Sequence, residues 1–169
     1  MINDYIKLGK NLEWKKKLIY AGIFIQENKL HAVYDRYNMI TCKQWLLLAV
    51  LSGFDKNPDL SSVAQAMGCS RQNVKKLALK LESDGYIKLY KSSLDGRSLY
   101  IDKTEKGASD KTEKGASLFK QMEEIGIIVH NNIFKDFTDK EIEQYFDLSI
   151  KLLNGIEHLD DYFKKIKSE

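Results

Sequence analysis

The sequence is poor in residues that interrupt regular structure. It holds one proline, Pro58, and ten glycines among 169 residues. These are too few turn formers for an all-β protein, which needs a turn between its many short strands. No stretch approaches the roughly 20 apolar residues that a membrane-spanning helix requires, and the first ten residues lack the apolar run of a secretory signal. The sequence therefore predicts a mainly helical protein of the cytoplasm.

Cysteine and histidine are also scarce. The two cysteines, Cys42 and Cys69, provide neither a disulfide framework nor a metal-ligand spacing. The three histidines, His31, His130 and His158, are scattered along the chain, and no nucleophile–base or metal-ligand constellation surrounds any of them. We therefore expect no catalytic residue, no metal and no cofactor, and an enzyme is the least favoured class of function.

Charge is plentiful but unevenly distributed. Charged residues make up 30% of the chain against 43% hydrophobic residues, and the two signs are mixed, which is typical of a folded domain. The net charge of +3 says little by itself. Residues 70–97 hold seven Lys or Arg against three Asp or Glu, a net charge of +4, whereas residues 140–169 hold five against seven, a net charge of −2. The basic region therefore coincides with one short segment.

That segment belongs to the stretch around which the chain is organised, residues 63–101. A short helix, capped by Asp59 or Ser61, ends at Gly68, where a left-handed backbone allows a tight turn. Ser70 caps a second helix whose apolar residues recur at i, i+3, i+4 and i+7. Its inward residues are Val74, Leu77, Ala78 and Leu81. Strands are expected at 86–90 and 99–101, so the stretch reads as a helix-turn-helix followed by a β-hairpin, which is a winged helix.

The outward face of the second helix is polar and basic near its N-terminus. Such a face suits insertion into a DNA major groove, because its side chains reach phosphates and base edges. The candidate DNA-binding residues there are Ser70, Arg71, Gln72, Asn73, Lys75 and Lys76. In the wing, Lys91 and Arg97 are further candidates, with Asp95 orienting the Arg97 guanidinium toward a minor groove or phosphate. Taken alone, the helix face is more typical of solvated surface; the neighbouring turn and wing favour nucleic acid instead.

The helices expected on either side carry excess apolar surface. Residues 11–34 predict a helix with apolar side chains on several faces, which indicates contact with a second subunit or an ordinary core helix. Thr41 and Gln44 form a capping box that starts a helix at Cys42. This helix is apolar almost all round, so we expect it to be buried, and Gly53 ends it.

The C-terminal third is also expected to be helical. Residues 118–134 continue the helical pattern, and a second capping box, Thr138 with Glu141, starts the final helix. The stripe of that helix consists of Ile142, Phe146, Ile150, Leu153 and Ile156. A long amphipathic helix after a complete small domain indicates a partner surface.

An unusual feature precedes the C-terminal helices. The octapeptide DKTEKGAS at 102–109 recurs unchanged at 110–117, which indicates a tandem duplication rather than a functional repeat. Inserted into a helix, eight residues would rotate its start by about 80°. Gly107 and Gly115 make a loop or a frayed turn equally possible, and the sequence leaves both open.

In this order of elements the chain resembles the MarR family of transcriptional regulators. The matching motifs are Thr41–Trp45, Val63–Gly68, Leu81–Ile87, Asp95–Ser98, and the Thr-Glu-Lys-Gly at Thr104 or Thr112. The resemblance implies a mainly α (α+β) fold in one domain, 1–169. The winged helix-turn-helix would occupy 41–103, and the dimerisation helices would occupy 11–36 and 112–165.

The resemblance also implies a function. Family members bind pseudo-palindromic operators in double-stranded DNA as homodimers, with the first helix pairing with the last two across the two-fold axis. They commonly repress transcription and release DNA when a small aromatic or anionic ligand binds or a cysteine is oxidised. The alternative is a winged-helix interaction module that does not bind DNA. The duplication departs from the family pattern at the joint between wing and dimerisation helices.

The cysteines are a second departure. Peroxide-sensing members carry a reactive cysteine in the first helix, where this chain has none. Cys69 directly precedes the recognition-helix cap, where the positive end of a helix favours a thiolate. It is therefore a possible redox switch, or simply a small residue tolerated in a turn. Cys42, just inside a buried helix, is expected to be structural.

Overall fold

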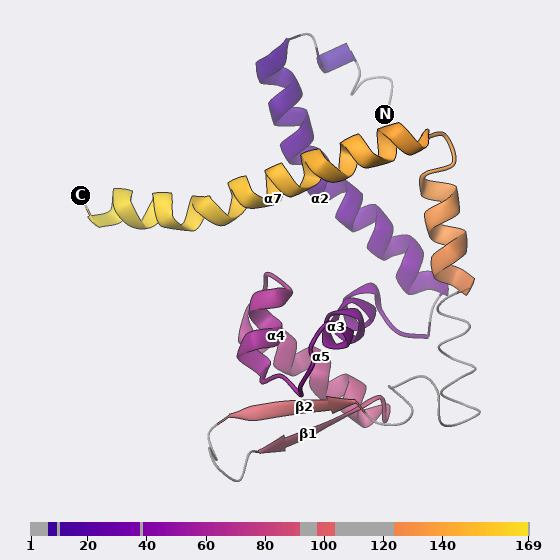
Figure 1. Cartoon of the computed structure of the whole chain (residues 1–169), viewed down its shortest axis with the longest axis vertical. Helices are drawn as coiled ribbons and strands as arrows, with labels where there is room; N and C mark the ends of the chain where they lie inside the picture. Colours follow the sequence, from indigo (N-terminus) through magenta and orange to yellow (C-terminus); the bar gives the residue numbers. More distant parts are fainter. Residues whose placement is uncertain (1–6, 10, 38, 92–97, 104–123, 169) are drawn as a thin grey trace. The chain divides into compact units, whose positions relative to one another are not determined.

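The computed structural model describes residues 7–9, 11–37, 39–91, 98–103 and 124–168. The chain divides into two compact units, Met1–Lys120 and Gln121–Glu169. Asp95 and Arg97, and nearly all of the duplicated octapeptide, lie outside the described residues. The elements in chain order (Figure 1) are α2 (Leu12–Tyr37), α3 (Cys42–Ser52), α4 (Leu60–Ala66), α5 (Arg71–Ser83), β1 (Ile87–Lys91), β2 (Leu99–Lys103) and α7 (Asp139–Ser168), and residues 124–133 are also helical. No helix within the described part of the chain is long and apolar enough to cross a membrane.

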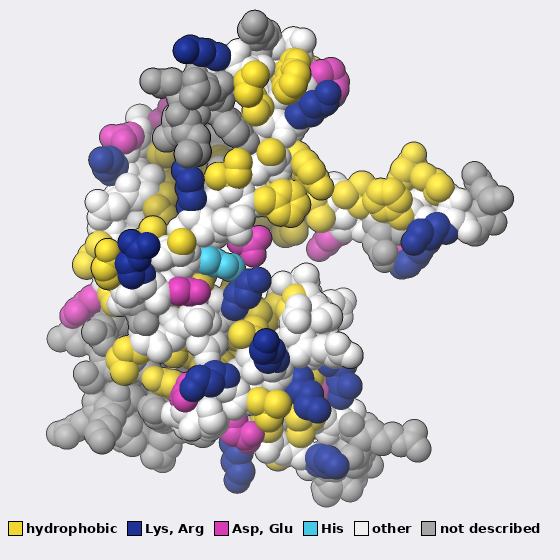
Figure 2. Space-filling view, turned by 180° about the vertical axis from the view of Figure 1, so that it is seen from behind, with side chains coloured by type: hydrophobic (Ala, Val, Ile, Leu, Met, Phe, Trp, Pro, Cys, Tyr) yellow, Lys and Arg dark blue, Asp and Glu magenta, His cyan; other side chains and the backbone are white. Residues whose placement is uncertain are grey.

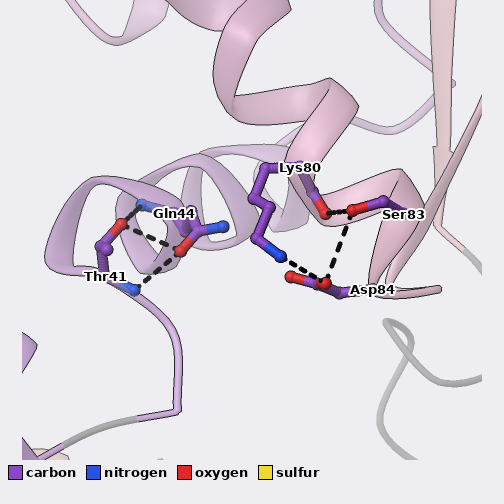
Figure 3. Close-up of polar contacts among 5 residues, drawn as sticks. All are labelled: Thr41, Gln44, Lys80, Ser83 and Asp84. Atoms are coloured by element: carbon purple, nitrogen blue, oxygen red, sulfur yellow. Dashed lines mark hydrogen bonds and ion pairs between the residues drawn. The ribbon is translucent and has the colours of Figure 1, made fainter.

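The predicted start of α3 is confirmed. The Thr41 Oγ1 accepts a hydrogen bond from the Gln44 N–H at 3.3 Å, and the Thr41 N–H donates to the Gln44 Oε1 at 2.8 Å (Figure 3). The prediction that α3 is buried all round is wrong. Leu47 and Leu51 are buried, but Leu46 is 39% exposed. The cause is geometric: the elements that contact α3 are α2, α4 and α5, and they leave part of its circumference uncovered.

One core holds the winged helix together. Its fully buried side chains come from α3, α4, α5 and both strands, and they are Leu47, Leu51, Leu60, Val63, Val74, Leu81, Ile87 and Ile101. Ala78 is also buried and Leu77 is half-buried, so the predicted inward face of α5 is confirmed. Helix α5 contacts α3, α4 and β1, and Figure 1 shows it beside these elements. Burial on this scale fixes the orientation of α5 and therefore of its opposite face.

The turn between α4 and α5 is built as predicted. Of the two candidate caps for α4, Asp59 is the one used, since its Oδ1 accepts from the Ser62 N–H at 2.7 Å. At the other end Gly68 has φ +62°, and the Cys69 N–H donates to the Ala64 carbonyl at 3.0 Å. This is a Schellman ending, which needs a residue that tolerates the left-handed region. The turn therefore depends on Gly68.

Loss of the Asp59 cap should destabilise the winged helix. We expect Asp59→Ala to lower the free energy of unfolding by about 1 kcal/mol at pH 7. The Ser62 N–H holds the pKa of Asp59 below its usual range. The stabilisation is therefore present above the unfolded pKa of about 3.9 and is lost as pH falls through the lower folded value. Urea unfolding curves at pH 7 and at stepwise lower pH measure both effects. Ser61→Ala is the control, and an equal loss in both variants at pH 7 would contradict the assignment.

The hairpin is antiparallel, with Leu89 opposite Ile101 and Lys91 opposite Leu99. Compared with the predicted strands, β1 begins and ends one residue later, and β2 begins as predicted and ends two residues later. The Tyr90 and Tyr100 rings, directly across from one another, stack at 5.8 Å between centroids. The Ile101 N–H donates to the Pro58 carbonyl at 2.9 Å, so the loop before α4 lies along the free edge of β2.

The long N-terminal helix α2 exposes most of its apolar side chains. Only Tyr34 is buried among its 26 residues. Its exposed large apolar residues include Leu12, Ile19, Tyr20, Phe24, Ile25, Leu30 and Val33. The two sequence-based alternatives for α2, a partner surface and an ordinary core helix, both stay predictions.

The final helix α7 begins at the predicted capping box. The Thr138 N–H donates to the Glu141 Oε2 at 2.8 Å, and the Glu141 N–H donates to the Thr138 Oγ1 at 3.3 Å. The helix runs for 30 residues. Its predicted stripe is exposed throughout, from 39% at Ile142 to 62% at Phe146. Figure 2 shows hydrophobic side chains along this helix.

Candidate nucleic-acid interface

Helix α5 presents its polar face to solvent. The Ser70 Oγ accepts a hydrogen bond from the Asn73 N–H at 3.2 Å, so the predicted cap is present. Val74, Ala78 and Leu81 face the core. The predicted DNA-binding residues of this region are all exposed, and they are Ser70, Arg71, Gln72, Asn73, Lys75 and Lys76. The structure thus gathers the six predicted residues on the cap and the exposed side of one helix.

Most cations of α5 are available to an anionic partner. Lys80 is not: its Nζ lies 2.8 Å from the Asp84 Oδ1 (Figure 3). Lys75 and Lys76 form no ion pair with any described carboxylate. Figure 2 shows several Lys and Arg side chains over the part of the molecule that carries the hairpin and α5. An unpaired cation on a fixed helix is the arrangement that phosphate contacts require.

The hairpin contributes cations of its own. Lys91, predicted from the sequence, is exposed at the end of β1. Lys88 is exposed as well, although it is not among the DNA-binding residues predicted from the sequence. The signal was the strand alternation, in which Ile87 points into the core and Lys88 away from it. The proposed pairing of Asp95 with Arg97 falls outside the described residues and stays a prediction.

The two cysteines lie in different environments. The Cys42 N–H donates to the Asp35 Oδ1 at 2.7 Å, and burial together with the Asp35 and Glu27 carboxylates raises the pKa of the Cys42 thiol. A raised pKa disfavours the reactive thiolate, in agreement with a structural role for Cys42. Cys69 is half-buried in the turn before α5; its role as an oxidant sensor stays a prediction.

Metal-ligating side chains do not cluster in the part of the chain that the structure describes. No three His, Cys, Asp or Glu side chains of that part of the chain gather into a site that could hold a metal ion. Burial raises the pKa of the Tyr34 hydroxyl to about 12. Its ring packs near Trp45 at 6.1 Å between centroids, so Tyr34 joins α2 to α3.

The sequence matches no protein-family model and no curated protein. Solved structures do match. A MarR/EmrR family transcriptional regulator from an Acinetobacter species is 24% identical, with a TM-score of 0.67 over 85% of this chain and 97% of that one. An organohalide-sensing transcriptional regulator with 2,4-dichlorophenol bound is 18% identical, with a TM-score of 0.72 over 89% and 88%.

A third similar structure contains nucleic acid. It is MepR of S. aureus in complex with DNA, which is 18% identical, with a TM-score of 0.61 over 86% of this chain and 98% of that one. These likenesses cover 85–89% of this chain and 88–98% of the similar chains, so they are not limited to the helix-turn-helix. The chain therefore has the winged helix-turn-helix fold of the MarR family of transcriptional regulators.

Proposed function

We propose that this chain is a MarR-family regulator that binds double-stranded DNA sequence-specifically and catalyses no reaction. The observation that carries the proposal is the exposed face of α5. Arg71, Gln72 and Asn73 occupy its first turn, and Lys75 and Lys76 continue the face without a described ionic partner. Gln and Asn read base edges in the major groove, Lys neutralises phosphates, and the helix N-terminus attracts a phosphate.

The functional unit is a homodimer on a pseudo-palindromic operator. Support comes from apolar surface that the chain leaves exposed on α2 and α7, on segments that the family resemblance assigns to dimerisation (11–36 and 112–165). A helix with a continuous exposed apolar stripe gains most of its stability by packing that stripe against another surface. In the dimer, two α5 helices enter successive major grooves one helical turn apart.

The regulator acts in the cytoplasm as a repressor, because a dimer that covers a promoter blocks polymerase without further parts. A small ligand or an oxidant releases it from DNA. Two similar structures support a small-molecule effector: one contains 2,4-dichlorophenol, and the other is PcaV of Streptomyces coelicolor in complex with its natural ligand. Cys69, in the turn before α5, is the candidate site for an oxidant.

Footprinting on the DNA upstream of the protein's own gene tests the proposal. We expect protection of two half-sites one helical turn apart, and loss of protection when the effective phenolic ligand or oxidant is added. Absence of any sequence-selective protection would support the alternative, a winged-helix module that binds another protein.

Arg97→Ala, at the predicted wing tip, serves as a second probe. Unchanged operator affinity and salt dependence in this variant would show that the wing does not reach DNA.

Gln72→Ala should relax specificity at one operator position. Gln72 is exposed in the first turn of α5, where a side chain reaches base edges. We expect discrimination at that position to fall by about 1–3 kcal/mol, with little change at the others. Binding to a panel of operators with single base-pair changes measures this. Ser83→Ala, at the opposite end of α5, is the control. A Gln72→Ala protein with the wild-type preference at every position would remove Gln72 from the readout.

A further inference from the structure

The end of α5 is defined by backbone hydrogen bonds at Gly85. Gly85 has φ +80°, its N–H donates to the Glu82 carbonyl at 2.9 Å, and the Tyr86 N–H donates to the Leu81 carbonyl at 2.9 Å. These two bonds make a Schellman motif. Leu81 and Tyr86, which flank the motif, are both buried. The chain therefore leaves α5 in one fixed direction and enters β1 at once.

A side-chain bond then joins the helix to the strand. The Leu89 backbone N–H donates to the Glu82 Oε1 at 2.7 Å. Leu89 lies in the middle of β1, and Glu82 lies in the last turn of α5. A carboxylate that accepts from a backbone N–H makes a charge-assisted bond, which is stronger than a neutral one. The bond attaches the strand that carries Lys88 and Lys91 to the helix that carries the candidate base-reading residues.

The opposite edge of the hairpin is held separately. The Ile101 N–H donates to the Pro58 carbonyl, and the Asn57 Nδ2 donates to the Tyr90 hydroxyl at 3.3 Å. A two-stranded hairpin alone is marginally stable in water, so its orientation depends on what holds its edges. Among the described residues, Glu82 is the α5 side chain whose hydrogen bond reaches the β1 backbone.

We propose that Glu82 is a positioning residue for DNA binding, which sets the angle between the wing and the recognition helix so that both reach one DNA duplex. The inference rests on the proposed DNA-binding function. It predicts a change in DNA affinity opposite to the change that electrostatics alone predicts for the loss of Glu82. Removing a negative charge near a DNA-binding face favours binding to a polyanion, whereas removing the bond to Leu89 frees the wing and weakens binding.

Two variants with the same charge change separate these effects. Glu82→Gln keeps an oxygen that accepts from the Leu89 N–H, and Glu82→Met keeps the side-chain length without an acceptor. We expect Glu82→Met to bind the operator about tenfold more weakly, and Glu82→Gln to retain affinity within about threefold of the wild type. Asp84→Asn removes a neighbouring carboxylate that pairs with Lys80, and it should leave affinity unchanged or slightly raised.

A double-mutant cycle shows whether Glu82 acts through the wing. Lys91→Ala removes an exposed cation of β1. Its penalty on operator affinity should be severalfold in the wild type and should nearly vanish in the Glu82→Met background, because a freed wing no longer places Lys91 at the DNA. A general loss of folded protein would leave the fold-change in affinity caused by Lys91→Ala the same in both backgrounds. Hydrogen exchange of the Leu89 amide should be faster in Glu82→Met, with or without DNA.

The results distinguish a failure of the positioning role of Glu82 from a failure of the proposed DNA-binding function. Affinity in Glu82→Met equal to or above that of the wild type, or equal penalties of Lys91→Ala in both backgrounds, would overturn the positioning role. Unchanged exchange of the Leu89 amide would also overturn it, because the bond would then not hold the strand. A wild-type protein that binds no operator would instead refute the proposed function, and the exchange experiment would still test the bond between Glu82 and Leu89.

Discussion

Replacing Lys75 and Lys76 together by glutamate is expected to abolish specific DNA binding. Both side chains are exposed on α5, and neither forms an ion pair with a described carboxylate. The double reversal removes two phosphate partners and places two anions against the DNA backbone. We expect a loss of affinity on the order of a thousandfold at physiological salt. Fluorescence anisotropy with a labelled operator, repeated over a range of salt concentrations, measures it.

The dependence of affinity on salt concentration shows whether lost phosphate contacts cause the weaker binding. Each phosphate contact contributes about 0.9 to the slope of log affinity against log salt concentration, so the slope should become shallower by about two. Lys76→Ala alone should weaken every DNA sequence to a similar degree, since a phosphate contact carries no sequence information. The control is Lys7→Glu with Lys56→Glu, two exposed positions outside α5, the hairpin and the proposed dimerisation segments, which makes the same change in net charge. Equal losses in the control and in the α5 variant would mean that overall charge, and not this face, determines binding.

Placing aspartate at both Phe146 and Leu153 is expected to convert a dimer to a monomer. The two positions are seven residues apart on one side of α7 and are 62% and 51% exposed in the single chain. If this stripe is buried between subunits, two unpaired charges would be placed in an apolar interface, which is strongly unfavourable. Light scattering should then give the single-chain mass of 19.5 kDa in place of twice that value.

The variant with aspartate at Phe146 and Leu153 should also bind the operator more weakly. Two linked recognition helices gain about 10²- to 10⁴-fold in affinity over one, so we expect a loss on the order of a thousandfold. The winged helix of each protomer should stay folded, because both positions are exposed within a protomer. Gln144→Asp with His158→Asp is the matched control, since these residues lie about 120° or more around the helix from Phe146 and Leu153. A wild-type protein that is monomeric at all concentrations would refute the dimer but leave the α5 interface open to test.

Several local features were predictable because the residues that form their hydrogen bonds lie close together in the sequence. The capping boxes at Thr41 and Thr138, the Ser70 cap and the turn at Gly68 each depend on residues three to five positions apart. Their hydrogen bonds are closed by the backbone of the element that they start or end. The buried face of α5 was predictable for a related reason, because helical periodicity alone assigns Val74 and Leu81 to one side.

Other features depend on how the elements pack. The exposure of Leu46 on α3 follows from where α2, α4 and α5 meet that helix, which its nearly uniform apolar sequence does not indicate. The contact between Asn57 and Tyr90 joins residues 33 positions apart.

The sequence by itself determined the order of the elements, where most of them begin and end, and which side of α5 is polar. These properties arise from local hydrogen bonds and periodicity, which neighbouring residues supply. Only the tertiary structure decided that Glu82, at the end of α5, bonds to the Leu89 amide in the middle of β1. That bond forms because the Schellman turn and the shared core bring the strand back beside the helix, and no local pattern specifies such an approach.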